Sequence, residues 1–275
     1  MNNFMKTGLV AITASLAASA SHAGLEGIGS ADVAFANPIF GTTGSDTVKI
    51  RYRDDSGELT SMRTSAGRFT GAVSSDDFDA NIMYEDADNV FLYCVDLFQS
   101  VGSGWNVDYE VHKLSEEGPN TLSTDAHQRE RDFGRTLDFL GALNFTLANS
   151  YGVDFGQYSW LNPRNSWMSG AIQLGIWESL YEDFSPEGAS WDIDAGDFSV
   201  VGTGGKDINP RGSVFLDEVF SNIEGTNALE SKYVLVLTSD TRQDMIVGDP
   251  PIGVSAPASA TLLLAGLGVL RRRRR

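Results

Sequence analysis

Two apolar segments, one at each end of the 275-residue chain, leave residues 24–248 as the part that can fold as a domain. The first segment carries Lys6, continues through the small and apolar residues 8–18, and ends at Ser21-His22-Ala23. A positive start, an apolar middle and small residues at the cleavage positions are typical of a secretory signal peptide. We therefore expect residues 1–23 to form a signal helix that signal peptidase removes after Ala23. A buried N-terminal helix is the alternative.

The other segment, residues 249–275, combines a linker, a short apolar stretch and a basic end. The linker opens with Asp249-Pro250-Pro251, residues 259–270 are mostly apolar, and residues 271–275 are five arginines. Such a stretch is marginal for crossing a bilayer, which takes ~20 residues, and the arginines would stay on the cytoplasmic side. We expect a short helix that tethers the precursor to the inner membrane. A cytosolic tail that binds nucleic acid is the alternative.

This tail resembles the PEP-CTERM sorting signal of Gram-negative bacteria, which has a short proline-containing motif, an apolar helix and a basic end. Here the motif is Val254, Ser255, Ala256, Pro257 and Ala258, without the usual glutamate. The resemblance implies processing by an exosortase after transient contact with the inner membrane. It also implies a final location on the cell surface or in the extracellular matrix.

The charge of the remaining body excludes one class of partner. The full chain has a net charge of −17, so removing Lys6 and the five terminal arginines leaves a net charge of −23. We expect such a body to bind neither nucleic acid nor anionic lipid. Acidic residues cluster at 76–79 and 192–197, but neither run has the spacing of a calcium-binding EF-hand loop. No zinc-type spacing of His and Cys occurs, and we expect no metal and no cofactor.

Hydrophobic patterning predicts an α+β fold. Strands are expected at 47–52, 65–71, 90–95, 109–114 and 233–237, with a hairpin turn at Asp54–Gly57. Helices are expected at 124–150, ended by Gly152, and at 166–181, capped by Asn165 or Ser166. After Glu182 we expect strand and loop. This order predicts a sheet or barrel-like body with an inserted helical subdomain.

Cys94 is the only cysteine, so an exported chain of this sequence has no internal disulfide. It lies in the apolar run Val90-Phe91-Leu92-Tyr93-Cys94-Val95, which predicts a buried strand. A single cysteine in a secreted protein suggests an intermolecular bond or a reactive thiol. A small buried hydrophobic side chain is the alternative.

Gln173 lies in the second expected helix, beside a stripe of apolar residues. Met168, Ile172, Ile176 and Leu180 recur every four residues and form that stripe. Burying an amide beside them is unfavourable without a hydrogen-bond partner. A structural glutamine with such a partner is the simplest interpretation.

The segments Tyr93-Cys94-Val95 and Ile172-Gln173-Leu174-Gly175-Ile176-Trp177 resemble the two signatures of bacterial thioester domains. In that family the cysteine sulfur and the glutamine side-chain carbonyl condense with release of ammonia. The resemblance implies an internal thioester between Cys94 and Gln173 in a thioester-type domain spanning residues 24–248. It implies a surface adhesin or biofilm-matrix protein that bonds once to an amine or hydroxyl of its target. Such a protein is not an enzyme that turns over.

Other functions have weaker support in the sequence. A non-covalent structural or glycan-binding matrix protein is the main alternative, with Trp105, Trp160 and Trp167 as a glycan platform or as core residues. A secreted hydrolase would need a nucleophile motif, and no G-x-S-x-G elbow is present. His112 or His127 could assist acyl transfer at a thioester, although a histidine without such a role is the simpler interpretation.

Overall fold

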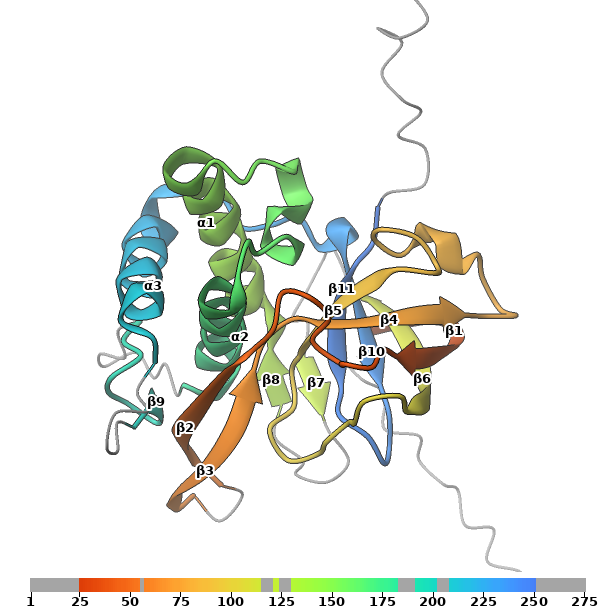
Figure 1. Ribbon diagram of the computed structural model, residues 1–275, viewed down its shortest axis with the longest axis horizontal. Helices are drawn as coiled ribbons and strands as arrows, with labels where there is room; N and C mark the ends of the chain where they lie inside the picture. Colours follow the sequence, from red (N-terminus) through yellow and green to blue (C-terminus); the bar gives the residue numbers. More distant parts are fainter. Residues whose placement is uncertain are drawn as a thin grey trace, which may run out of the picture.

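A computed structural model describes residues 25–54, 57–114, 121–123, 130–182, 191–201 and 208–250. The expected signal helix, the sorting motif and apolar helix of the tail, and His127 lie outside these ranges. Within them, none of the helices has the length and apolar character needed to cross a bilayer. The expected α+β class is confirmed, because a β-barrel fills one side of the molecule and helices gather on the other (Figure 1).

Six antiparallel strands close the barrel in the order β1-β4-β5-β11-β10-β6. Their bounds are β1 (Leu25–Phe35), β4 (Phe69–Ser74), β5 (Val90–Cys94), β6 (Asn106–Leu114), β10 (Val234–Thr238) and β11 (Met245–Gly248). From 106 to 111, β6 alternates exposed and buried residues, which places one face inside the barrel. Strand β5 is buried at every position, as expected for a strand covered on both faces.

Two smaller sheets accompany the barrel. One has the order β3-β2-β9, formed by β2 (Asp46–Arg53), β3 (Leu59–Ala66) and β9 (Phe198–Val200), and the other pairs β7 (Thr121–Ser123) with β8 (Glu130–Asp132). The turn expected between β2 and β3 is confirmed. The Asp54 N–H donates to the Glu58 carbonyl at 2.9 Å, and Gly57 has a φ of +81°, which suits glycine.

The single strand expected at 65–71 is wrong. Strand β3 ends at Ala66 and β4 begins at Phe69, and the two belong to different sheets. Between them Gly67 lies against the backbone of Gly44 and Ser45, so close that a Cβ would be about 3.1 Å from the Gly44 carbonyl oxygen. The chain turns at this close approach, and the apolar pattern on either side of it resembles one continuous strand.

The helices are α1 (Phe133–Tyr151), α2 (Ser166–Tyr181) and α3 (Pro210–Asn222), with short 3₁₀ turns η1 (Ala80–Ile82), η2 (Gly156–Leu161), η3 (Ile223–Gly225) and η4 (Ser231–Tyr233). Helix α2 has the expected bounds, and its cap is Asn165, whose side chain accepts the Met168 N–H at 3.1 Å. Helix α1 ends before Gly152 as expected, with a φ of +61° there. It starts later than expected, because residues 130–132 form β8.

Helix α3 contradicts the expectation of strand and loop after Glu182. Pro210 opens it, and the Asn209 side chain caps it by accepting the Arg211 N–H at 3.0 Å. The residues it buries follow helical spacing: Gly212, Phe215, Leu216, Val219 and Phe220. An Asn-Pro start followed by this spacing is a helix signal, so the sequence contained the evidence for α3.

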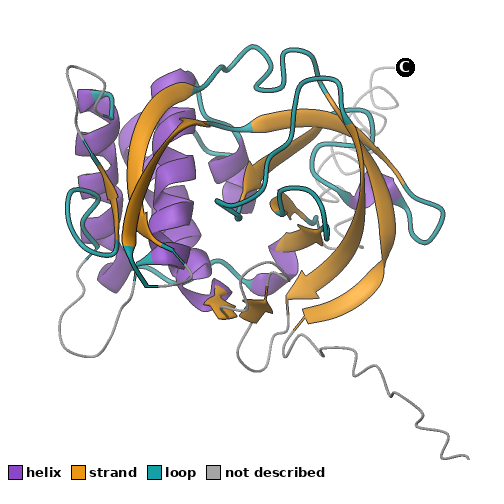
Figure 2. Ribbon diagram, turned by 90° about the horizontal axis from the view of Figure 1, so that it is seen from below, coloured by secondary structure: helices purple, strands orange, loops and turns teal. Residues whose placement is uncertain are grey.

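Helix α2 is the central element of the helical side. It packs against α1, α3, β2 and β3 (Figures 1 and 2). Residues 168–181 are all buried, so the helix is covered on every face rather than along the single stripe that the sequence predicts. A helix enclosed in this way has a fixed rotation and height, which fixes the position of each polar side chain that it carries.

Gly175 provides a test of how tightly α2 is held. A Cβ at this position would lie 2.1 Å from the ring of Phe139, which is itself fully buried. We expect Gly175→Ala to lower the free energy of unfolding, because overpacking costs about 1–3 kcal/mol and alanine regains only about 1 kcal/mol of helix propensity. Chemical denaturation measures the change. Gly225→Ala, where nothing lies within 4 Å of the new Cβ, is the control and should leave stability nearly unchanged.

Candidate functional site

Cys94 is the last residue of β5, and it lacks a strand neighbour on one side. On the other side β11 pairs with β5, with Met245 opposite Cys94. Strand β4 pairs with β5 only as far as Phe69, which lies opposite Leu92. Continued by two residues, this register would place Gly67 opposite Cys94, but β4 does not extend that far.

The side chain of Gln173 takes the place of the missing strand. Its Oε1 accepts the Cys94 backbone N–H at 2.9 Å, and its Nε2 donates to the Cys94 carbonyl oxygen at 2.7 Å. These are the two bonds that a residue of an antiparallel strand would make with Cys94. Both residues are 0% exposed, so the pairing satisfies groups whose burial alone would cost about 1–3 kcal/mol each. The structure thus brings together the two residues that the sequence singles out.

Helix α2 holds the glutamine against this part of the barrel through a second contact. Tyr181 lies two turns beyond Gln173 on the same helix face. Its hydroxyl donates to the Val95 carbonyl at 3.3 Å and accepts the Leu97 N–H at 3.0 Å. The helix therefore runs along residues 94–97 and is hydrogen-bonded to them at both ends of the segment.

The thiol of Cys94 is hydrogen-bonded to a backbone carbonyl two residues further along the chain. Its Sγ donates to the carbonyl oxygen of Asp96 at 2.6 Å. Burial raises the pKa of the thiol well above its ordinary value, and the negative charges of Asp96 and Asp244 raise it further. The side chain of Trp177 and the backbone at Asp96 act in the opposite direction on this pKa. In the folded protein the sulfur is accordingly held as a protonated thiol.

The segment between β10 and β11 covers the thiol. The Gln243 side chain donates to the Asp96 carbonyl at 2.8 Å, which is the same oxygen that accepts the thiol. The Tyr109 hydroxyl donates to the Gln243 carbonyl at 2.9 Å. On the outside, Arg242 lies over the ring of Trp105 at 4.6 Å. These contacts surround the carbonyl to which the thiol donates, and Cys94 itself is fully buried.

This geometry supports attack of the sulfur on the amide carbon of Gln173 in two respects. The amide is fixed beside Cys94 in a dry environment, and proximity of this kind removes most of the entropic cost of a reaction between two side chains. The amide carbonyl also accepts the N–H of the nucleophile's own residue, which is the arrangement of an oxyanion-hole donor. Attack on that carbon would require the sulfur to give up its hydrogen bond to the Asp96 carbonyl.

The histidines are not part of this arrangement. His112 lies on β6, where Cys94 is separated from it in the sheet by β11 and β10. It is opposite Val236 in the ladder, and its Nε2 is hydrogen-bonded to the Thr238 hydroxyl at 2.9 Å. His127 lies outside the described residues. The structure thus gives His112 a structural contact rather than a position beside the thiol.

The three tryptophans considered as a glycan platform do not form one. Trp160 is fully buried and packs on Tyr93, with ring centroids 5.9 Å apart. Trp167 is partly buried and packs against Tyr151 and Phe215. Trp105 is 41% exposed. Two of the three are therefore packing residues, and the platform is wrong.

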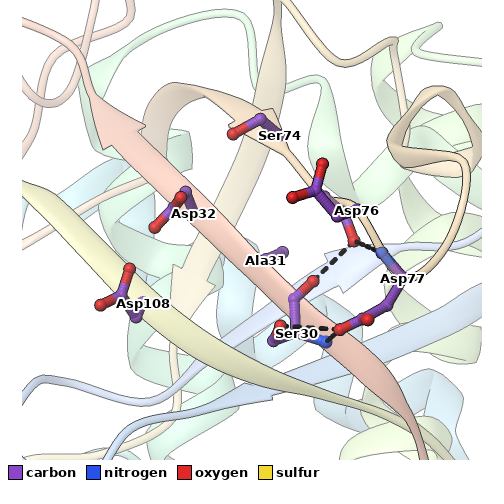
Figure 3. Close-up of a pocket in the computed structure, with 8 residues that line it drawn as sticks. Ser30, Ala31, Asp32, Ser74, Asp76, Asp77 and Asp108 are labelled. Atoms are coloured by element: carbon purple, nitrogen blue, oxygen red, sulfur yellow. Dashed lines mark hydrogen bonds between the residues drawn. The ribbon is translucent and has the colours of Figure 1, made fainter.

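The acidic run at 76–79 borders a pocket of about 320 Å³ beside β1 and β4 (Figure 3). One carboxylate oxygen of Asp77 accepts both the Ser30 N–H at 2.8 Å and its hydroxyl at 2.7 Å, and Asp79 caps η1. Across the pocket, a hydrogen bond and charge repulsion from Asp108 raise the pKa of Asp32. Within the described part of the chain, no group of three or more acidic, His or Cys side chains could hold a metal ion.

The other acidic run, 192–197, is likewise engaged in local contacts. Asp192 accepts the Asp194 N–H at 3.0 Å, and Asp197 pairs with Arg53 at 2.5 Å. Calcium binding at either run therefore has no support from the described geometry.

Glu178, on α2, is a buried acid that sequence reasoning missed. It is 0% exposed, one carboxylate oxygen accepts the Asp192 N–H at 3.1 Å, and the other has no hydrogen-bond partner. Burial raises its pKa to about 9, with repulsion from Glu182 and Asp192 adding to the shift, while the Asp192 N–H and Arg135 oppose it. The sequence signal was an acidic residue one position after Trp177 in an otherwise apolar helix.

The raised pKa predicts a pH dependence of stability. The stabilisation from the bound proton is complete below the ordinary pKa of 4.5 and is lost as the pH rises through about 9. We expect Glu178→Gln, which keeps the acceptor oxygen but does not titrate, to become progressively more stable than the wild type across this range. Denaturation at a series of pH values measures the difference. Glu224→Gln, at an exposed position, is the control, and equal slopes for both variants would contradict the assignment.

Comparison of the chain with protein-family models, curated proteins and solved structures finds no match in any of the three. The chemistry of the Cys94–Gln173 pair is therefore argued from its own geometry. The resemblances to thioester domains and to the PEP-CTERM tail remain predictions from short motifs.

Proposed function

We propose that this protein is an exported surface or matrix protein that forms an internal thioester between Cys94 and Gln173 and uses it to bond covalently to a target. The pair of hydrogen bonds that joins the Gln173 amide to the backbone of Cys94 is the observation that carries the proposal. The motifs around both residues, which resemble those of bacterial thioester domains, support it.

The bond-forming step consumes both side chains and needs no outside reactant. The Cys94 sulfur attacks the amide carbon of Gln173 to form a tetrahedral intermediate, whose negative oxygen is Oε1. The Cys94 N–H already donates to this oxygen at 2.9 Å, where it stabilises the developing charge. The thiol proton passes to the leaving nitrogen, the carbon–nitrogen bond breaks, and one ammonia departs.

The thioester then acts as an acyl donor. A lysine amine or a hydroxyl of the target attacks the same carbon, the thiolate leaves and takes up the nucleophile's proton, and an amide or ester joins Gln173 to the target. Because the glutamine is consumed, each molecule reacts once. Burial of the bond protects it from water until a target arrives.

The rest of the proposal concerns export. The segments 1–23 and 249–275 suit removal by signal peptidase and recognition by an exosortase. An inner-membrane precursor followed by release to the cell surface or matrix of a Gram-negative bacterium fits the acidic body, whose net negative charge disfavours binding to nucleic acid. The target of attachment carries an accessible amine or hydroxyl.

A non-covalent matrix protein is the second candidate, and one observation favours it. The Cys94 thiol donates to the Asp96 carbonyl, and the glutamine amide is hydrogen-bonded on both its oxygen and its nitrogen. In that function Gln173 only replaces the missing strand neighbour of β5. The two candidates differ in covalent structure, so a mass measurement separates them.

The intact mass of the exported protein is the decisive measurement. We expect it to be lower by one ammonia than the mass calculated for the processed chain that begins at Gly24, and we expect Cys94→Ala and Gln173→Ala, processed at the same ends, to have their full calculated masses. Methylamine should add to the wild type and to neither variant. A wild-type protein with full mass and an alkylatable thiol after unfolding would establish the non-covalent function.

A further inference from the structure

Three side chains of α2 follow one another along the thiol end of β5. Gln173, Trp177 and Tyr181 are spaced by four residues, so they share one face of the helix. Gln173 bonds to the backbone of Cys94, and Tyr181 bonds to the Val95 carbonyl and the Leu97 N–H. Trp177, between them, therefore lies against the same four-residue segment, which contains the Cys94 thiol.

The indole N–H of Trp177 has no conventional hydrogen-bond partner. The side chain is 1% exposed, and its Nε1 is among the buried polar atoms that pair with no nitrogen, oxygen or sulfur acceptor at normal geometry. An unpaired buried donor is unfavourable and is rare enough in native proteins to need an explanation. The Trp177 side chain nevertheless lies near enough to the Cys94 sulfur to lower the pKa of the thiol as a hydrogen-bond donor, although the contact does not reach normal hydrogen-bond geometry.

The charges around the sulfur make this donor significant. Asp96 and Asp244 disfavour a thiolate, and burial disfavours it more. The hydroxyl of Tyr109, on β6, also lies within electrostatic range of Cys94. Among the side chains that act on this thiol, Trp177 is the one that favours its negative charge.

We infer that the Trp177 indole N–H is the donor that stabilises the Cys94 sulfur when it carries negative charge, both as the thioester forms and as it opens. The inference rests on the proposed thioester and specifies which residue sets its reactivity. In the resting thiol the N–H gains little from the sulfur, since a neutral sulfur is a weak acceptor. As the sulfur becomes negative, the N–H forms a charge-assisted bond, which is roughly twice as strong as a neutral one.

A donor role and a simple packing role predict opposite changes in the rate at which the thioester opens when Trp177 is replaced. Trp177→Phe removes the N–H and also leaves space beside the thioester, because phenylalanine is smaller. If Trp177 only packs, the space admits small nucleophiles and the thioester opens faster. If the N–H stabilises the departing thiolate, the thioester opens more slowly.

The test follows the reaction of the intact protein with methylamine by mass spectrometry. We expect Trp177→Phe to open about tenfold more slowly than the wild type, which corresponds to about 1.4 kcal/mol of lost transition-state stabilisation. Trp160→Phe is the matched control, since Trp160 is also fully buried with an unpaired Nε1 but packs on Tyr93. It should open at the wild-type rate or faster. Unchanged or faster opening of Trp177→Phe would overturn the inference.

Two further measurements keep the test decisive. If Trp177→Phe folds poorly, a tryptophan analogue with sulfur in place of the ring nitrogen can be placed at position 177. It removes the N–H at nearly constant volume and should slow the reaction equally.

If the wild type has full mass, the proposed function fails by itself. The donor is then tested on the free thiol, whose reaction with methyl methanethiosulfonate should be slower in Trp177→Phe, and equal or faster reaction would exclude the donor.

Discussion

The pairing of the Gln173 amide with the backbone of Cys94 joins the two halves of this fold. Strand β4 begins only at Phe69, opposite Leu92, and without a substitute the Cys94 N–H and C=O would be buried and unpaired. A side-chain amide carries one donor and one acceptor in the geometry of a peptide group, so glutamine can replace one residue of a strand. Gln173 of α2 thus supplies the hydrogen-bonding neighbour that β5 lacks at Cys94. The same two bonds fix the position of α2 relative to β5.

The turn at residues 67 and 68, which comes just before β4, explains why the substitute is needed. The Arg68 N–H donates to the Ser169 hydroxyl at 2.7 Å, and its guanidinium donates to the Leu161 carbonyl at 2.6 Å while lying over the Phe91 ring at 3.6 Å. The backbone N–H of Arg68 thus bonds to α2 and not to β5, while its side chain reaches η2 and covers Phe91 of β5. The pairing of β4 with β5 starts only at Phe69, and Gln173 of α2 occupies the position beside Cys94.

Local signals explain which parts of the fold could be predicted. Helix α2 has an Asn165 cap and an apolar sequence of helical spacing, and its bounds follow from the sequence alone. Strands β1 and β11 have no such signal, because they are defined by pairing with β4, β5, β6 and β10 across the barrel. The gap opposite Cys94 was equally hidden, since it depends on where Gly67 turns in space. Only the motif resemblance suggested that Cys94 and Gln173 meet.

The environment of Cys94 fits chemistry that happens once. An enzyme that uses cysteine repeatedly needs a thiolate that is accessible and maintained by a nearby base or positive charge. Here the sulfur is buried, its pKa is raised by burial and two carboxylates, and His112 lies on another strand of the barrel. Exclusion of water lowers the reactivity of a thiol, and it would also protect an acyl donor from hydrolysis. Under the proposed function, the same burial would therefore preserve the thioester until a nucleophile reaches it.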